Sequence, residues 1–262
     1  MIRAKKSLGQ NFLVDKDIIN KIADILEIKD KSILEIGPGT GNLTTALLKR
    51  DPKNVYVIEK DNNLANLLKN EFKDQLKVIN DDVLKVNENL ICKEELIVFG
   101  NLPYNISTEI LIKWILNLDN KNLWFSNLIL MFQKEVADRI ISKFNSSTYG
   151  RISILANWKL DIKKIIDIRP NSFSPRPKID SSLLFFSPKK KFFKIENPKN
   201  LEKITRIFFN HRRKMIKKPY NQIFSGNYEI LKKLKINLNL RPQNLDFETY
   251  YKLTNEYENL RN

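Results

Sequence analysis

Short apolar runs alternate with amphipathic segments through the first two thirds of the chain. An uninterrupted apolar run is typical of a strand buried on both faces, whereas apolar residues three and four apart form one face of a helix. Strands are predicted at residues 33–36, 55–58, 76–79, 96–99, 128–132, 162–168 and 183–186. Helices are predicted to begin at Asp15, Asn42, Asp61 and Ser107. Strands that alternate with helices pair in parallel, so we predict an α/β fold with a seven-stranded sheet.

The pattern changes near residue 186. Residues 169–182 are too short and too rich in proline for a crossover helix, so the last two strands should form an antiparallel hairpin at the sheet edge. A basic linker with aromatic residues follows, and beyond residue 200 the periodicity is helical, with helices predicted at 201–209, 229–234 and 246–260. We therefore predict an α/β domain over residues 1–187 and a small all-α domain over residues 188–262.

The net charge of +16 favours a polyanionic partner such as nucleic acid. A solvated, lysine-rich surface is the alternative, and local clustering of charge is the feature that favours RNA. The residues predicted to contact RNA phosphates lie near the amino terminus and in the helical domain: Arg3, Lys5, Lys6, Arg212, Arg213, Lys214, Lys217 and Lys218.

Rare residue types narrow the chemistry. The single cysteine, Cys92, excludes an intrachain disulfide and a thiolate metal cluster, and it agrees with a reducing compartment. The single histidine, His211, excludes a multi-histidine metal site, so no metal is expected. No apolar stretch resembles a signal peptide or a membrane span, and we expect a cytoplasmic protein that does not enter a membrane.

The most informative motif is Asn101-Leu102-Pro103-Tyr104, directly after the predicted strand at 96–99. An amide oxygen can accept hydrogen bonds from a planar amine while an aromatic ring stacks on the base that carries it. This combination indicates chemistry on the amine of a nucleobase.

A glycine-rich loop supplies the second indication. Gly37, Gly39 and Gly41 follow a predicted strand, although the chain contains only seven glycines, and they favour a nucleotide-like cofactor at the start of a helix. The dehydrogenase fingerprint has a further glycine where this chain has Asn42. Together with the preceding motif, the loop predicts methyl transfer to a base.

Acidic residues at two strand ends could complete the cofactor site. Glu59 could accept hydrogen bonds from both hydroxyls of a ribose. Asp82 could accept from the amino group of an adenine while Val83 covers the face of the ring. Exposed acids at strand ends and in turns are the alternative explanation.

Several motifs in order carry a resemblance that spans nearly the whole chain. They are LGQNFL at 8–13, EIGPGTG at 35–41, GNLPYNIS at 100–107, QKEV at 133–136, FSPRPKIDS at 173–181 and FNHRRK at 209–214. The chain resembles the ribosomal RNA adenine dimethyltransferases, and most closely the housekeeping enzymes of the small subunit. The resemblance implies a Rossmann-like, seven-stranded methyltransferase domain that uses S-adenosylmethionine, releases S-adenosylhomocysteine and precedes a small all-α domain.

The resemblance also implies a substrate. Two adjacent adenosines in a hairpin loop near the 3′ end of 16S rRNA would become dimethyladenosines during biogenesis of the 30S subunit, and the enzyme would be a monomer. In the cofactor site, Asn11 and Leu13 would contact the cofactor, Gly37 would approach its methionine portion, and Gly39, Glu59, Asp82 and Val83 would complete the site.

For the target base, the resemblance implies that Asn101 lies between cofactor and target and that Tyr104 and Phe173 stack on either side of the flipped base. A core aromatic is the alternative for Phe173. We hypothesise that the Asn101 side-chain oxygen and the Leu102 carbonyl accept hydrogen bonds from both N–H groups of the amine, which aims the nitrogen lone pair at the methyl group without a strong base.

Three other classes of function stay open from the sequence. An oxidoreductase would use the glycine loop, but it assigns no role to residues 101–104. A non-catalytic assembly factor could bind immature small subunits with the same fold. A large-subunit RNA methylase that confers antibiotic resistance shares the LGQNFL stretch, and the FNHRRK segment is the feature that favours the small-subunit enzymes.

Overall fold

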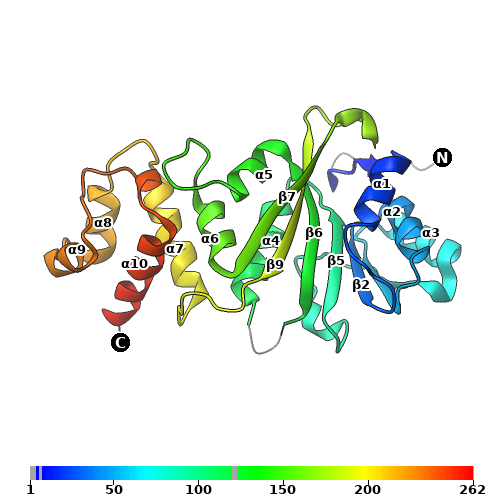
Figure 1. Ribbon diagram of the computed structural model, residues 1–262, viewed down its shortest axis with the longest axis horizontal. Helices are drawn as coiled ribbons and strands as arrows, with labels where there is room; N and C mark the ends of the chain where they lie inside the picture. Colours follow the sequence, from blue (N-terminus) through cyan, green and yellow to red (C-terminus); the bar gives the residue numbers. More distant parts are fainter. Residues whose placement is uncertain (1–3, 6–7, 120–122, 262) are drawn as a thin grey trace. The chain divides into compact units, whose positions relative to one another are not determined.

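The computed structural model describes residues 4–5, 8–119 and 123–261 and contains a seven-stranded mixed sheet (Figure 1). The strand order is β4-β3-β2-β5-β6-β9-β7. The five strands from β4 to β6 run parallel to one another, and β9 runs antiparallel to β6. The bounds are β2 Ser32–Ile36, β3 Asn54–Ile58, β4 Lys77–Ile79, β5 Leu96–Asn101, β6 Phe125–Gln133, β7 Leu160–Ile168 and β9 Ser181–Pro188. The predicted α/β class and the seven strands are confirmed.

Burial explains why the strand predictions succeed. All five residues of β2 are buried, as are the first five of β5, because helices cover both faces of the central strands. The predicted edge hairpin is also present, since β9 lies between β6 and the edge strand β7. The Ser182 hydroxyl in β9 donates to the Asp167 carboxylate in β7 over 2.5 Å.

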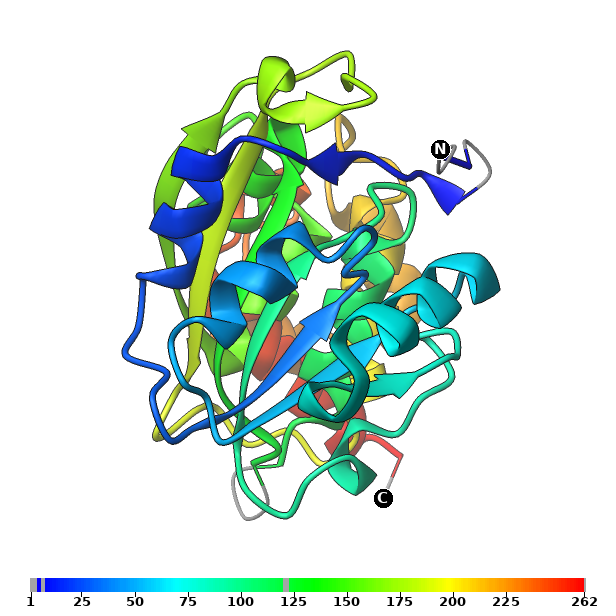
Figure 2. The same cartoon turned by 90° about the vertical axis from the view of Figure 1, so that its right-hand side faces the viewer.

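One small sheet was not predicted. Strand β1 (Phe12–Leu13) pairs antiparallel with β8 (Phe173–Ser174), and in Figure 2 the blue amino-terminal segment runs beside the yellow-green segment that contains β8. Two-residue strands have no measurable periodicity, so only the tertiary contact reveals them.

The predicted helix starts are accurate to within one residue. Helix α1 (Lys16–Ala23) is capped by Asp15, whose carboxylate accepts from two main-chain N–H groups, and α3 (Asn62–Phe72) is capped by Asp61. Helices α2 (Asn42–Leu48) and α4 (Ser107–Asn117) start at the predicted residues. Helices α1 and α2 pack into one apolar core with the sheet.

Two helices within residues 1–187, the predicted α/β domain, were not predicted. Helix α5 (Lys134–Ile140) spans only seven residues. Helix α6 (Arg151–Lys159) is buried over most of its surface, with Ile154, Leu155, Ala156 and Trp158 all inaccessible, so its sequence lacks the contrast between apolar and polar faces.

The carboxyl-terminal part is helical, with α7 Pro198–Phe209, α8 Lys217–Phe224, α9 Tyr228–Leu234 and α10 Phe247–Asn259. The rings of Phe208 and Phe209 pack on the buried Tyr250 at centroid distances of 5.7 and 5.8 Å. Helix α8 was not among the predicted helices.

The chain divides into two compact units. The first comprises Met1–Lys113, Asp119–Ala137 and Ile162–Pro188, and the second comprises Trp114–Leu118, Asp138–Asp161 and Lys189–Asn262. This division differs from the predicted one because α6 belongs to the helical unit, where Tyr251 of α10 donates to the Ile154 carbonyl over 3.2 Å. That two functional domains meet at residues 187 and 188 stays a prediction.

Candidate active site

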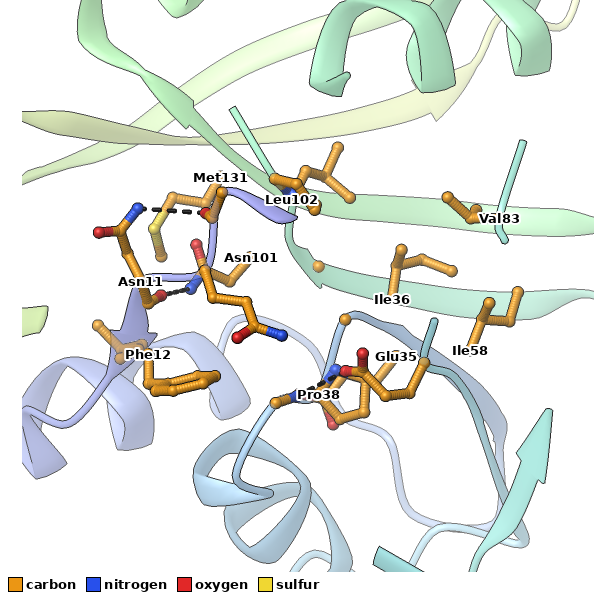
Figure 3. A pocket seen from close by; sticks show the side chains of 18 of the residues that line it. Asn11, Phe12, Glu35, Ile36, Pro38, Ile58, Val83, Asn101, Leu102 and Met131 are labelled. Carbon is orange, nitrogen blue, oxygen red and sulfur yellow. Dashed lines mark hydrogen bonds between the residues drawn. The ribbon is translucent and has the colours of Figure 1, made fainter. Parts of the chain in front are cut away.

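A pocket lies at the carboxyl ends of β2, β3 and β5, within the first unit. In parallel α/β sheets, this edge is where ligands bind. Residues 8–13, 35–40, 58–60, 81–83 and 100–106 contribute most of its wall. Figure 3 shows the labelled side chains of Asn11, Glu35, Val83 and Asn101 around this cavity. Five segments that are distant in sequence therefore form one concave surface.

The glycine loop adopts a conformation that side chains disfavour. The φ angles of Gly37, Gly39 and Gly41 are 64°, 59° and 79°, all in the left-handed region. A Cβ on Gly39 would lie 2.6 Å from Cδ1 of Phe12, which leaves no room for a side chain. A Cβ on Gly37 would find only the Asn101 carbonyl within 4 Å, at 3.8 Å, so the backbone there is open to a ligand.

Glu59 is buried beside this loop and is 6% exposed. One carboxylate oxygen accepts from the Gly39 N–H over 3.2 Å and the other from the Asp61 N–H over 2.8 Å. Burial raises the pKa of Glu59, although these main-chain donors oppose the shift. Since each carboxylate oxygen has two lone pairs, Glu59 keeps acceptor capacity for a ligand hydroxyl.

Glu35 is a second buried carboxyl that lines the pocket, and no role was predicted for it. Its side chain is 2% exposed and accepts from the Thr44 hydroxyl over 2.6 Å. Burial, opposed by the Thr44 hydrogen bond and aided by the nearby charge of Glu59, raises the pKa of Glu35 to about 7. A carboxylate inside an otherwise apolar strand was the signal that could have identified it.

Asp82 and Val83 form another part of the wall. The Asp82 carboxylate accepts from the Lys60 ammonium over 2.7 Å and from the Leu84 N–H over 3.0 Å. The Lys60 bond is the main reason that the pKa of Asp82 lies below its usual value. Val83 is 6% exposed and presents an apolar surface.

Asn101 and Asn11 join the sheet to the amino-terminal segment. The side-chain nitrogen of Asn101 donates to the main-chain oxygen of Asn11 over 2.7 Å. The side-chain oxygen of Asn101 is therefore the atom left to accept from a substrate. Leu13 is held nearby, because the Asn42 side chain donates to its carbonyl over 2.8 Å.

The two predicted stacking residues differ in location. Tyr104 lines the pocket, and its hydroxyl lies 2.5 Å from that of Ser181, while burial raises the pKa of the phenol. Leu102 also lines the pocket and is 1% exposed. Phe173 is 2% exposed, belongs to the apolar core and, among the described residues, is not part of the pocket wall. The structure thus places Tyr104 in the pocket wall and Phe173 in the apolar core.

The predicted RNA contacts also differ from one another. Arg3 and Lys6 lie outside the described residues, and Lys5 forms an ion pair with Asp61 at 2.8 Å. Arg212 is half-buried and donates to the Ser146 carbonyl over 3.3 Å. The exposed members of the carboxyl-terminal cluster are Arg213, Lys214, Lys217 and Lys218. Their contact with RNA stays a prediction.

Among residues 4–5, 8–119 and 123–261, no group of three or more His, Cys, Asp or Glu side chains could hold a metal ion. No helix in these described ranges has the length and apolar character needed to cross a membrane.

The strand order, the antiparallel strand β9 and the glycine turn after β2 match the fold of the Rossmann-like methyltransferases. The model of one family, "Ribosomal RNA adenine dimethylase", matches residues 1–259. The chain therefore belongs to the ribosomal RNA adenine dimethylase family, whose enzymes depend on S-adenosylmethionine. The predicted family, fold and enzyme class are confirmed, and an oxidoreductase is excluded.

Individual relatives agree with this assignment. "Ribosomal RNA small subunit methyltransferase A" of Pelagibacter ubique (strain HTCC1062) is 64% identical over 260 residues, which cover 99% of both chains. A dimethyladenosine transferase from Plasmodium falciparum has a crystal structure with a TM-score of 0.79 and 27% identity, covering 95% of this chain and 98% of that one. The 23S rRNA methyltransferase ErmE shares the fold, with a TM-score of 0.67 and 21% identity over 95% of this chain and all of that one.

Proposed function

We propose that this protein transfers methyl groups from S-adenosylmethionine to the exocyclic amines of two adjacent adenosines near the 3′ end of 16S rRNA. The products would be dimethyladenosines in the assembling 30S subunit. The name of the Pelagibacter relative, which matches nearly the full chain, supports the small-subunit substrate. The observation that carries the proposal is the Asn101 amide at the end of β5, held by Asn11 so that its oxygen stays available in the pocket.

The residues present fit the proposed cofactor. The open backbone at Gly37 suits close approach of a ligand, while the absence of a side chain at Gly39 lets the Phe12 ring pack against the loop. Glu59 would accept from the ribose hydroxyls, Asp82 would accept from the adenine amino group, and Val83 would cover the ring. Asn11 and Leu13, which also line the pocket, would contact the cofactor from the amino-terminal segment. When bound, the cofactor supplies a methyl group on a sulfonium, which is already electrophilic.

Positioning supplies the remaining chemistry. The lone pair of an aromatic amine is delocalised into the ring, so the amine is a poor nucleophile. The Asn101 side-chain oxygen and the Leu102 carbonyl would accept hydrogen bonds from its two N–H groups and favour a tetrahedral nitrogen. The nitrogen would bond to the methyl carbon as the carbon–sulfur bond breaks and leaves its electrons on sulfur, and the amine would then release a proton to solvent. A second round produces the dimethylated amine.

Aromatic stacking would hold the extruded base. Tyr104 lines the pocket, and its bond to Ser181 fixes the ring. Stacking of Phe173 on the opposite face would require a rearrangement of β1 and β8, since this side chain is packed in the core. Base–aromatic stacking offsets part of the energy lost when a base leaves its helix.

Affinity for the ribosomal particle would come from the exposed basic residues around Arg213. We infer a monomer that acts in the cytoplasm, where small subunits assemble. Lys5 is less suited to contact RNA, because its ammonium is paired with Asp61.

Nucleoside analysis tests the proposal. The protein would be incubated with labelled S-adenosylmethionine and either immature small subunits or large-subunit RNA. Label in dimethyladenosine of the small subunits alone supports the proposal. Label in large-subunit RNA favours the antibiotic-resistance methylases, and binding to small subunits without methyl transfer favours an assembly factor.

A further inference from the structure

The ammonium of Lys113 holds one segment of the chain at three points. It donates to the Val83 carbonyl over 2.7 Å, to the Val86 carbonyl over 2.5 Å and to the Glu88 carboxylate over 2.8 Å. The Lys113 side chain is 19% exposed and the Glu88 side chain 6%. A lysine ammonium has three donors, and here one short segment receives all of them.

The segment held by Lys113 continues directly from the pocket wall. Residues 81–83 line the pocket. Within the turn that follows, the N–H groups of Lys85 and Val86 donate to the Asp82 carbonyl over 2.8 and 3.2 Å. These local bonds shape the turn, and the Lys113 bonds attach it to α4.

Helix α4 begins just after the motif at residues 101–104, which is proposed to face the target amine. The Ser107 hydroxyl at its start donates to the Tyr104 carbonyl over 3.3 Å, and the Ile106 N–H donates to the Pro103 carbonyl over 3.1 Å. A helix rises about 1.5 Å per residue, so Lys113 lies roughly 9 Å along a stiff element from Ser107. One helix therefore connects the wall around Asp82 to the wall around Asn101.

We propose that Lys113 is a positioning residue that holds the 82–88 segment in the geometry needed for cofactor binding. This inference rests on the proposed placement of the cofactor adenine against Asp82 and Val83. Without the ammonium, two main-chain carbonyls and a nearly buried carboxylate lose a charged donor. The segment would then shift toward solvent and take Val83 with it.

Calorimetric titration of S-adenosylhomocysteine without RNA tests the inference. Lys113→Met keeps the length and apolar stem of the side chain but removes its donors. We expect the dissociation constant to rise about tenfold, the effect of losing roughly one charged hydrogen bond. Lys252→Met is the matched control, because Lys252 in α10 also forms an ion pair with a glutamate, Glu248. Its side chain differs from that of Lys113 in being 48% exposed. The dissociation constant of this control should stay within a factor of two of the parent.

Two further readouts separate positioning from general stability. In Lys113→Met, the KM for the cofactor should rise while kcat and the KM for RNA stay within about twofold. Amide hydrogen exchange should accelerate at Lys85 and Val86 and stay unchanged in β5. A rise in the dissociation constant of less than threefold in folded Lys113→Met overturns the inference. If Lys113→Met does not fold, the dissociation constant of S-adenosylhomocysteine is measured for Glu88→Gln instead. A rise of less than threefold in that variant then overturns the inference.

Binding of S-adenosylhomocysteine to Asp82→Ala distinguishes failure of this inference from failure of the proposed function on which it rests. If Asp82→Ala weakens S-adenosylhomocysteine binding and Lys113→Met does not, only the role of Lys113 is wrong. If neither variant weakens binding, the proposed adenine site is wrong as well.

Discussion

The side-chain amide of Asn101 donates to the main-chain oxygen of Asn11 over 2.7 Å, which joins the end of β5 to a segment 90 residues earlier. An amide that can rotate freely presents its nitrogen or its oxygen to a ligand. Here the bond uses the nitrogen, so the oxygen is the atom available to accept from an amine. The amino-terminal segment thus orients the group proposed to bind the target.

Asn101→Ala should lower methyl transfer at saturating cofactor by a factor of about 10² to 10³, comparable to loss of one preorganised polar group. Binding of S-adenosylhomocysteine should survive, because most of the proposed cofactor contacts lie elsewhere. Single-turnover methylation and calorimetry measure the two effects. Turnover close to that of the parent would remove Asn101 from the mechanism.

Gly39→Ala should abolish tight cofactor binding and lower the free energy of unfolding by more than about 1 kcal/mol, since its φ is positive. The new methyl group would also lie 2.6 Å from the Phe12 ring. Gly150→Ala is the control, because the nearest atom to a Cβ there is 4.0 Å away and φ is −167°. Denaturant titration and cofactor binding check both variants. Equal behaviour of the two would contradict the packing argument.

Glu35 should make stability fall as pH rises. Its pKa is raised to about 7 in the folded protein, above the ordinary value of 4.5, so the folded state binds more protons than the unfolded state between these pH values. The contribution lost by pH 8 is on the order of 3 kcal/mol. Urea titrations at pH 5, 6, 7 and 8 measure it.

Glu35→Gln should remove that decline, since the amide does not ionise and can still accept from Thr44. Glu95→Gln is the control, because it removes the same formal charge from an exposed position. In this variant the free energy of unfolding should still fall as pH rises. A decline that persists in Glu35→Gln would assign the pH dependence to another group.

Phe173→Leu separates a stacking role from a core role. Leucine keeps most of the buried apolar volume, so the free energy of unfolding should fall by less than about 1.5 kcal/mol. If Phe173 stacks on the base, methyl transfer should fall roughly tenfold, as expected for base–aromatic stacking worth about 1 to 3 kcal/mol. Phe186→Leu, at an equally buried core position, should leave turnover unchanged. Equal turnover in both variants would make Phe173 a core residue only.

Charge reversal at Arg213 and Lys214 should weaken binding to small subunits and reduce the dependence of affinity on salt, by a slope of about one per lost phosphate contact. Both residues are exposed, so thermal stability should be unchanged. Reversal of the exposed Lys69 and Lys93 changes net charge equally and is the control. Equal loss of affinity in the two double variants would indicate an effect of net charge alone.

The elements that could be predicted are those with strong local signals. Strand β2 is apolar apart from Ser32 and Glu35, and Asp15 and Asp61 each precede a helix whose first N–H groups they accept. Helix α6 could not be predicted because it is buried on most sides, and β1 and β8 are too short to show a period. The location of the site could also be predicted, because the carboxyl ends of parallel strands meet at one edge of the sheet.

By itself, the sequence determined the fold class, the family and the segments that surround the pocket, because apolar periodicity, glycine placement and motif order are local properties. Only the tertiary structure decided that Lys5 pairs with Asp61, that Phe173 packs in the core, and that Lys113 reaches across to Val83. The partners of these two lysines are distant in the sequence, at 25, 27 and 30 residues from Lys113 and at 56 residues from Lys5. Such pairings depend on how separate elements pack, and a pattern read along one strand or helix does not contain that information.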